Sequence, residues 1–400
     1  MKLSKNLQIL FIALAIIPFF QSAIGYKYPI LGLGVQYSRY FFFGIVIILI
    51  LINTHAFSFI TRNTKIYLTI SLIFIFFTSA VVNNTDIVSV FQLSLYLLYP
   101  FLLFSVWADS STGTLNICKG ITYGLNTLVL INLFIMLFFP QGLYQTISSN
   151  TISYYYLFGA KNQMVAPIMT CLFFNMETAY RSYNKIITKT SLFMCFICAF
   201  ELIIGGSGTG LIVLAAFIIL CLLEFKHQKI SSNLSLIVLL ASFLAIVIFR
   251  IQNIFSFLIV DILHKSLTLS DRTYIWDAAI ESILSHPILG TGITDSLSGN
   301  VHLKLSYLVK DVFAHDLYLD YLLMGGIPAL CIFVCILISV KKSYDSFLNK
   351  KNTLIWWGIV VYLFASIVEI YTTNFCLFLM FAYINICDYS TRHRYIGQNL

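Results

Sequence analysis

Long apolar runs separated by short connectors constrain the fold of this chain more than any other feature. The runs are about twenty residues long and show no strict alternation of polar and apolar positions. Backbone N–H and C=O groups in hydrocarbon must be satisfied within the chain, so a spanning segment is either a helix or part of a closed barrel. Runs of this length without alternation are helices. The sequence therefore predicts an all-α, polytopic transmembrane helix bundle.

Twelve segments are expected to cross the membrane. The composition is that of a membrane protein, since 59% of the residues are hydrophobic and 10% are charged. A soluble domain carries about a quarter charged residues, so a water-soluble fold is excluded. We expect residues 1–400 to form one membrane domain, in which an apolar start resembling a signal peptide is kept as the first helix. The predicted spans are residues 7–24, 40–59, 66–82, 87–107, 120–139, 163–180, 186–204, 208–224, 233–249, 316–340, 354–371 and 374–388.

The distribution of Lys and Arg predicts the orientation, because cytoplasmic loops are enriched in these residues. With the N-terminus inside, sixteen of the twenty-four cations lie in cytoplasmic connectors or tails. Both termini are therefore expected in the cytoplasm of a cell whose plasma membrane the chain crosses. The cations show no cluster interleaved with exposed aromatic residues, so the net charge of +8 is assigned to topology and no nucleic-acid partner is expected.

Residues 250–315 form the one long hydrophilic connector, which this topology places on the outer face. The connector holds four of the seven histidines and six of the sixteen acids. A connector this long in a compact protein is usually functional, so chemistry is expected here. Ser270 can cap an amphipathic helix from Asp271 to about Leu284, which would lie along the membrane surface or cap the bundle. Its apolar stripe consists of Ile275, Trp276, Ala279, Ile280, Ile283 and Leu284.

Arg272 and His315 are the strongest candidates for chemistry. A guanidinium binds phosphate or pyrophosphate through a planar fork of donors and keeps its charge, although a surface arginine can also reach lipid headgroups. Arg272 shares a helix face with Trp276, four residues on. His315 opens the span after the connector, where a neutral imidazole can take a proton from a hydroxyl, although an interfacial histidine can equally be solvated. Asp316 and Asp320 lie close to His315 in the sequence, and their roles stay open.

Other polar residues are weaker candidates. Arg250 and Lys161 are outer-face cations that could flank an anionic headgroup. Glu369 is expected deep in the eleventh span, where an acid is a functional candidate by default. His286 precedes a proline and is more typical of a turn, in which the glycines at 290 and 292 would let the backbone approach a ligand closely.

No metal site or cofactor is expected. The histidines of the connector are 22, 16 and 13 residues apart, which differs from the short paired spacings of zinc ligands. Cys195 and Cys198 lie inside a span and are interpreted as packing residues. The glycine-rich segment 205–210 lacks the Lys-Ser/Thr ending of a phosphate loop and is interpreted as a tight outer turn.

Three short motifs resemble the O-antigen polymerase and O-antigen ligase family of bacterial envelope glycosyltransferases. They are DRTYIW at residues 271–276, HPILGTG at 286–292 and AHDLYL at 314–319, followed by the glycines at 325 and 326. The resemblance is local, covering about residues 270–330. Lys161-Asn162 also looks like the family's outer start of a middle helix. The chain departs from the family where Gly208 follows Ser207 in place of Arg, and where Asp316 stands in place of the commoner Asn.

The resemblance implies transfer of a glycan chain from undecaprenyl pyrophosphate to a sugar hydroxyl at the outer face of the plasma membrane. Arg272 and Arg250 would stabilise the departing pyrophosphate, and His315 would activate the acceptor hydroxyl; Lys161, Trp276, His286 and Asp316 would contribute to substrate binding. Implied partners are a lipid-linked oligosaccharide, membrane lipid, a chain-length regulator and a flippase. A ligase, a flippase for the same lipid-linked sugar and a protein without an active site remain alternatives.

Overall fold

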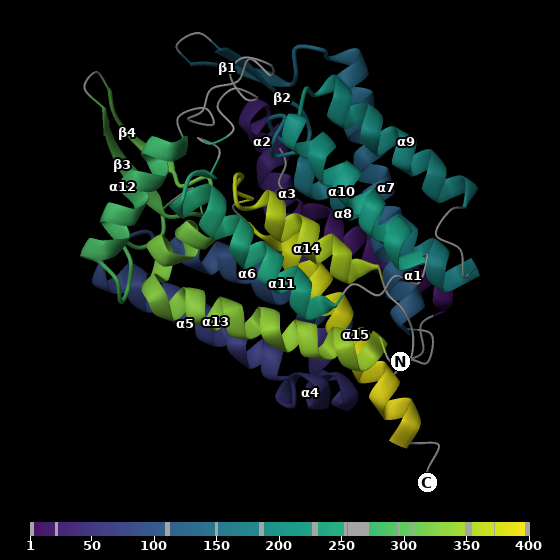
Figure 1. Cartoon of the computed structure of the whole chain (residues 1–400). Coiled ribbons are helices and arrows are strands. Elements are labelled where there is room, and N and C mark those ends of the chain that lie inside the picture. The colour runs from purple at the N-terminus through teal and green to yellow at the C-terminus, as the bar shows by residue number, and fades with distance from the viewer. Residues whose placement is uncertain are drawn as a thin grey trace.

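The computed structural model describes residues 4–20, 23–108, 113–148, 151–183, 188–225, 231–251, 254, 272–294, 297–305, 308–348, 354–371 and 373–396. Helices dominate this part of the chain, as predicted (Figure 1). In the first half they are α1 (Lys5–Ile16), α2 (Ile24–Lys27), α3 (Pro29–Leu51), α4 (Thr54–Thr61), α5 (Thr64–Val82), α6 (Ile87–Ser105), α7 (Gly113–Phe138) and α8 (Val165–Tyr183), with a 3-10 turn at Ile17–Phe19. In the second half they are α9 (Lys189–Ile204), α10 (Gly208–Phe225), α11 (Ser232–Phe243), α12 (Arg272–Ser285), α13 (Leu317–Leu348), α14 (Ile355–Ala365) and α15 (Phe375–Ile396), with a π-helical turn at Leu244–Ile248.

Two antiparallel hairpins were not predicted. Strands β1 (Tyr144–Ser148) and β2 (Thr151–Tyr155) lie in the connector between α7 and α8, and β3 (Asn300–Leu305) and β4 (Leu308–Phe313) lie between α12 and α13. Each strand is five or six residues long, so its hydropathy pattern is weak beside that of a twenty-residue helix. Both hairpins lie at one end of the bundle (Figure 1).

The chain is a multi-pass membrane protein by the length and apolarity of its helices. Five described helices are long and apolar enough to cross a bilayer: α3, α5, α6, α7 and residues 317–346 of α13. Every predicted span falls on at least one helix, although several of these helices are shorter than a bilayer is thick. The count of twelve crossings therefore remains a prediction.

The predicted span at residues 40–59 has the wrong boundaries. Helix α3 begins earlier, at Pro29, and ends at Leu51. Asn53 then caps α4, because its side-chain oxygen accepts hydrogen bonds from the backbone N–H groups of His55 and Ala56. An asparagine between apolar residues thus divides what hydropathy alone reads as one segment.

Helix α1 begins, and helix α15 ends, on the side of the bundle that lies away from the hairpins (Figure 1). Near the start of α1, Gln8 accepts a hydrogen bond from Asn116 in the first turn of α7, 2.8 Å away, and α7 then runs toward β1. Helix α15 begins near the hairpins and ends away from them (Figure 1). The two ends therefore lie on one side, which agrees with the prediction that both termini share a compartment; the cytoplasmic assignment remains a prediction.

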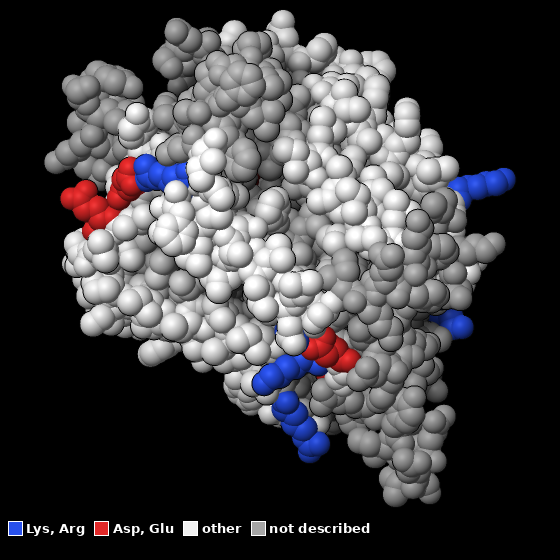
Figure 2. All heavy atoms as spheres, in the orientation of Figure 1, with Lys and Arg blue, Asp and Glu red and all other residues white. Residues whose placement is uncertain are grey.

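Charged side chains are sparse on the face in Figure 2 and gather toward the two ends of the bundle. The band between the ends is formed by uncharged residues in this view, and many of the exposed side chains of the described helices are large and apolar. A belt of this kind is expected where helices face lipid tails.

Helix α12 caps the bundle as predicted. It begins at Arg272, while the proposed cap Ser270 and the first residue Asp271 lie outside the described residues. Its predicted stripe packs inward at Ile275, Trp276, Ala279 and Ile283, against residues of α13 and the turn after α14. Leu284 is the exception, being 75% exposed.

The turn after α12 closes against a break in α13. Gly325 and Gly326 leave the helical conformation, and Gly326 has a φ of +68°. The carbonyl of Pro287 accepts a hydrogen bond from the N–H of Ile327, and the carbonyl of Leu323 accepts one from the N–H of Thr291. The glycines thus let two backbone segments of this protein meet, and the predicted close approach of the 290–292 turn to a ligand remains a prediction.

Candidate functional site

A cavity of about 280 Å³ opens at the end of the bundle that carries the hairpins. Its walls come from segments far apart in the sequence: the 3-10 turn after α1, the connector from β2 to α8, the first turn of α12, the residues between β4 and α13, and the turn from α14 to α15. Two predicted catalytic residues, Arg272 and His315, both line it. The structure therefore brings together two side chains 43 residues apart in the sequence.

Arg272 is held in the cavity by an ion pair. Its Nη2 donates to Oε1 of Glu369 at 2.5 Å, and the side chains are 15% and 5% exposed respectively. The same carboxylate oxygen accepts a hydrogen bond from Nδ2 of Asn162 at 2.6 Å. A buried pair of this kind fixes the guanidinium, because breaking it leaves an uncompensated charge in a poorly solvated place.

Glu369 was predicted to lie deep within the eleventh span, and this prediction is wrong. Helix α14 ends at Ala365, and Glu369 follows in the turn that leads to α15. The residues around it, such as Ile367 and Ile370, are apolar and buried, so hydropathy extends the predicted helix past its real end. The acid thereby reaches the cavity wall at the end of the bundle that carries the hairpins.

His315 occupies a strained position directly before α13. Its backbone has a φ of +51°, which is uncommon for a residue other than glycine and is often found at functional sites. Its Nδ1 is buried and has no hydrogen-bond partner. Burial, with a smaller contribution from the charge of Arg272, lowers the pKa of His315 to about 4. The imidazole is therefore neutral at neutral pH and offers an unoccupied nitrogen.

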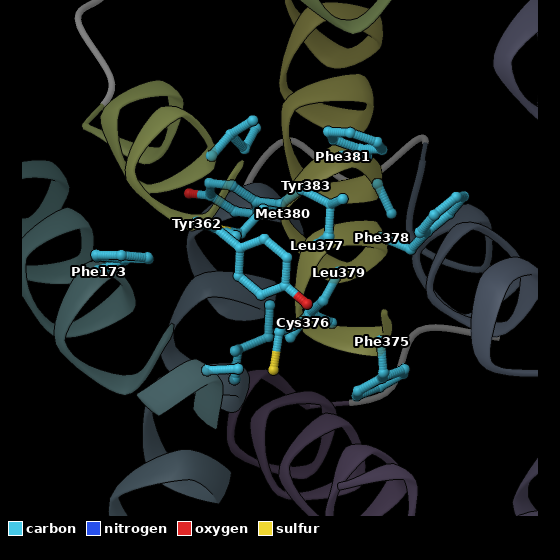
Figure 3. Close-up of a cluster of buried hydrophobic side chains, with 14 of the residues drawn as sticks. Phe173, Tyr362, Phe375, Cys376, Leu377, Phe378, Leu379, Met380, Phe381 and Tyr383 are labelled. Carbon is cyan, nitrogen blue, oxygen red and sulfur yellow. The ribbon is translucent and has the colours of Figure 1, made fainter. Parts of the chain in front are cut away.

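Two phenol groups complete the polar lining of the cavity. The hydroxyl oxygens of Tyr362 on α14 and Tyr371 in the following turn are buried without hydrogen-bond partners, and the two rings lie 5.0 Å apart. Figure 3 shows Tyr362 over the first turn of α15, among Phe375, Cys376 and Leu377. Buried polar atoms without partners are costly, and their grouping in one cavity is typical of a site that binds a polar ligand.

The predicted substrate-binding residues are placed differently from one another. Lys161 is exposed and adjoins Asn162 at the mouth of the cavity. Arg250 lies outside the cavity lining, with its Nη2 paired to Oδ1 of Asp277 and donating to the carbonyl of Thr273 at 3.2 Å. Its backbone has a φ of +51°. A role for either cation in binding substrate remains a prediction.

Trp276, His286 and Asp316 also lie outside the cavity lining. Trp276 is fully buried in the contact of α12 with α13. His286 is exposed, and its Nδ1 lies 2.9 Å from the hydroxyl of Ser285. Asp316 caps α13 through a 2.7 Å hydrogen bond from the N–H of Leu319. None of the three residues lines the cavity, so their role in substrate binding remains a prediction.

Most of the polar residues that line the cavity together with Arg272 were not predicted from the sequence. Asn162 was noticed beside Lys161 without a role, and Tyr362 and Tyr371 were not singled out. A signal was present for Asn162, since it follows an outer-face lysine at the start of a helix. No local pattern marks the tyrosines, because tyrosine is common in this chain, with 24 copies.

Among the residues that the structure describes, no group of three or more His, Cys, Asp or Glu side chains could hold a metal ion. The cysteines at 195 and 198 are free. Independence from metals remains a prediction about the reaction.

A family model matches part of the chain. The family model described as O-antigen ligase matches residues 193–334, which include α12, the turn that follows it, His315 and the break in α13. No curated protein matches the chain. The match begins at α9 and contains Arg250, Arg272 and His315, while Asn162 and Glu369 lie outside it. The predicted resemblance to the O-antigen polymerase and ligase family is thus confirmed for residues 193–334, which match the family model described as O-antigen ligase.

Proposed function

We propose that this protein transfers a glycan chain from undecaprenyl pyrophosphate to a sugar hydroxyl of a second lipid-linked repeat unit at the outer face of the bacterial plasma membrane. The observation that carries this proposal is the cavity in which the Arg272 guanidinium faces the same space as the free Nδ1 of His315. A cation for a leaving group and an acceptor for a proton are the two groups that glycosyl transfer from a pyrophosphate needs.

Arg272 stabilises the leaving group. As the bond between the anomeric carbon and the pyrophosphate oxygen breaks, the electron pair stays on that oxygen and its negative charge grows. A guanidinium has five N–H donors in a fixed plane, so its bond to Glu369 leaves others directed elsewhere. Glu369 and Asn162 act as positioning residues, because they hold Arg272 through one shared oxygen. Lys161 and Arg250 would add to the positive potential around the pyrophosphate.

His315 accepts the proton. The acceptor hydroxyl forms the new bond to the anomeric carbon and gives its hydrogen to the neutral Nδ1, so the proton and the leaving electron pair end on different groups. The depressed pKa of His315 keeps its imidazole neutral before the reaction, so that one ring nitrogen can accept a proton. The hydroxyls of Tyr362 and Tyr371 suit hydrogen bonds with sugar hydroxyls, since each can donate and accept.

A ligase acting on another acceptor is the second candidate, and the description of the matching family favours it. Both reactions use the same leaving group and the same proton transfer, so the cavity supports both. A flippase is less well supported, because the polar groups of the cavity gather at one end of the bundle rather than at the midplane where transporters bind their substrates.

The test replaces Arg272 and His315 separately with Ala in the host cell and examines the surface polysaccharide on a gel. Arg62→Ala and His55→Ala are matched controls, because both residues are exposed on or beside α4 at the other end of the bundle. We expect both site variants to reach the membrane and leave single repeat units, while the controls make full-length polymer. Polymer that accumulates on the lipid carrier would indicate the ligase, and normal polysaccharide in both site variants would refute the site.

A further inference from the structure

A second polar cavity lies at the end of the bundle opposite the proposed active site. It has a volume of about 590 Å³ and lies between the start of α7, the end of α8 and the start of α9. Its lining is unusually polar for a helix bundle in lipid, with hydroxyl and amide side chains such as Thr122, Asn126, Asn175 and Ser182. The hydroxyl of Ser182 is buried without a hydrogen-bond partner.

Two lysines give this cavity a positive charge. Lys119 projects from the second turn of α7 and is half-buried, and Lys189 is the first residue of α9. The cavity also includes Thr188, Thr190 and Ser191, so the positive end of the α9 dipole faces it. No Asp or Glu is among the lining residues. The chemistry therefore fits an anion that also accepts several hydrogen bonds.

An apolar groove adjoins the polar cavity and shares two of its wall residues, Lys119 and Tyr123. The groove has a volume of about 480 Å³ and runs between α1 and α7. Leu10 and Leu14, which line it, are 54% and 47% exposed, so it opens on the lipid-facing surface. Close packing at Gly120 and Gly124 fixes the two helices on either side, since a Cβ at Gly120 would lie 2.7 Å from Ile12.

We propose that these two hollows together bind one anionic phospholipid, with the headgroup phosphate in the polar cavity beside Lys119 and Lys189 and an acyl chain in the groove between α1 and α7. A free phosphate would explain the cavity but leave the groove unused, and a neutral lipid would explain the groove but not the lysines. Lys119 and Tyr123 line both the polar cavity and the apolar groove, so the two hollows are adjacent. This arrangement suits a ligand whose charged and apolar parts are covalently linked. This site is independent of the proposed glycosyl transfer.

In the test, the full chain is purified in detergent and mixed with defined phosphatidylglycerol or phosphatidylcholine. The lipids that the protein retains are then counted by native mass spectrometry. We expect the wild type to keep one phosphatidylglycerol in preference to phosphatidylcholine. Lys119→Gln should weaken that retention about fivefold, because one lysine near an anionic lipid contributes about 1 kcal/mol. Lys119→Arg should restore it, which separates the loss of charge from a loss of folding.

Lys342→Gln is the matched control, since Lys342 is exposed on α13 and lies outside both hollows. It should retain phosphatidylglycerol as the wild type does. The proposal is overturned if Lys119→Gln and Lys342→Gln retain lipid equally, if phosphatidylcholine binds as well as phosphatidylglycerol, or if millimolar inorganic phosphate alone displaces the bound lipid.

Discussion

At the scale of single residues, the position of Arg272 depends on one carboxylate oxygen. Oε1 of Glu369 accepts from both Arg272 and Asn162, so three residues spread over 207 positions meet at one atom. The pair is largely shielded from solvent, and breaking such a pair costs more than the pair itself contributes, because the remaining charge stays buried. The position of Arg272 in the cavity is therefore coupled to the turn between α14 and α15.

Replacing Glu369 should separate charge from geometry. Glu369→Ala removes both hydrogen bonds, and we expect it to lower the free energy of unfolding by about 3–5 kcal/mol and to abolish polymer formation. Glu369→Gln keeps an oxygen that can accept from Arg272 and Asn162, so it should retain more stability and more activity. Thermal unfolding in detergent and the polysaccharide gel measure the two effects.

Asp345→Ala is the control for this comparison. It breaks the pair with Lys341, in which the aspartate side chain is 40% exposed, and a hydrogen bond from the hydroxyl of Ser232, and should cost no more than about 2 kcal/mol. If Glu369→Ala is no more harmful than Asp345→Ala, Glu369 does not hold Arg272 in the working protein.

At the scale of elements, the turn after α12 and the break in α13 form one interlocked unit. A Cβ on Gly326 would lie 2.3 Å from the carbonyl oxygen of Ile288, and one on Gly290 would lie 2.2 Å from that of Leu323. Ser79 and Asn83 at the end of α5 donate to the carbonyls of the same turn. The unit joins α12, which carries Arg272, to α13, which follows His315, so it sets their relative position.

Gly326→Ala should disrupt this unit. The backbone conformation of Gly326, with φ +68° and ψ −165°, costs about 1–3 kcal/mol for a residue with a Cβ, and the contact with Ile288 adds to it. We expect a lower unfolding temperature and weaker polymer formation. Gly34→Ala on α3 is the control, because a Cβ there meets no atom within 4 Å, and it should be neutral or slightly stabilising. Equal unfolding temperatures for the two variants would contradict the role of the break.

The elements show what could be predicted and what could not. Apolar runs specify helices locally, because lipid leaves the backbone few other choices. The stripe of α12 was predicted from apolar residues at helical spacing. The pairing of Arg272 with Glu369 could not be predicted, since it depends on where α14 stops and how a distant turn packs. The glycines at 290 and 292 were predicted to be important, and their closest neighbours are the carbonyls of Leu322 and Leu323 in α13 and the side chain of Thr85 between α5 and α6.

At the scale of the whole molecule, the two cavities for which we propose functions lie at opposite ends of a helix bundle. The end with the hairpins carries the cavity with Arg272 and His315, and the opposite end carries the polar cavity with Lys119. The predictions of one membrane domain over residues 1–400, of a connector at 250–315 on the outer face and of cytoplasmic termini are compatible with this arrangement. Residues 255–271 of that connector lie outside the described part of the chain.

The most direct test of the central claim is to follow bond formation by the purified protein. The protein is reconstituted in liposomes with a lipid-linked repeat unit, and the release of undecaprenyl pyrophosphate is measured together with the length of the glycan. We predict release and chain growth by the wild type and by His55→Ala, and a rate about 10²–10⁴ times lower for His315→Ala. Movement of the lipid-linked sugar across the bilayer without release of pyrophosphate, or an undiminished rate in His315→Ala, would contradict the account.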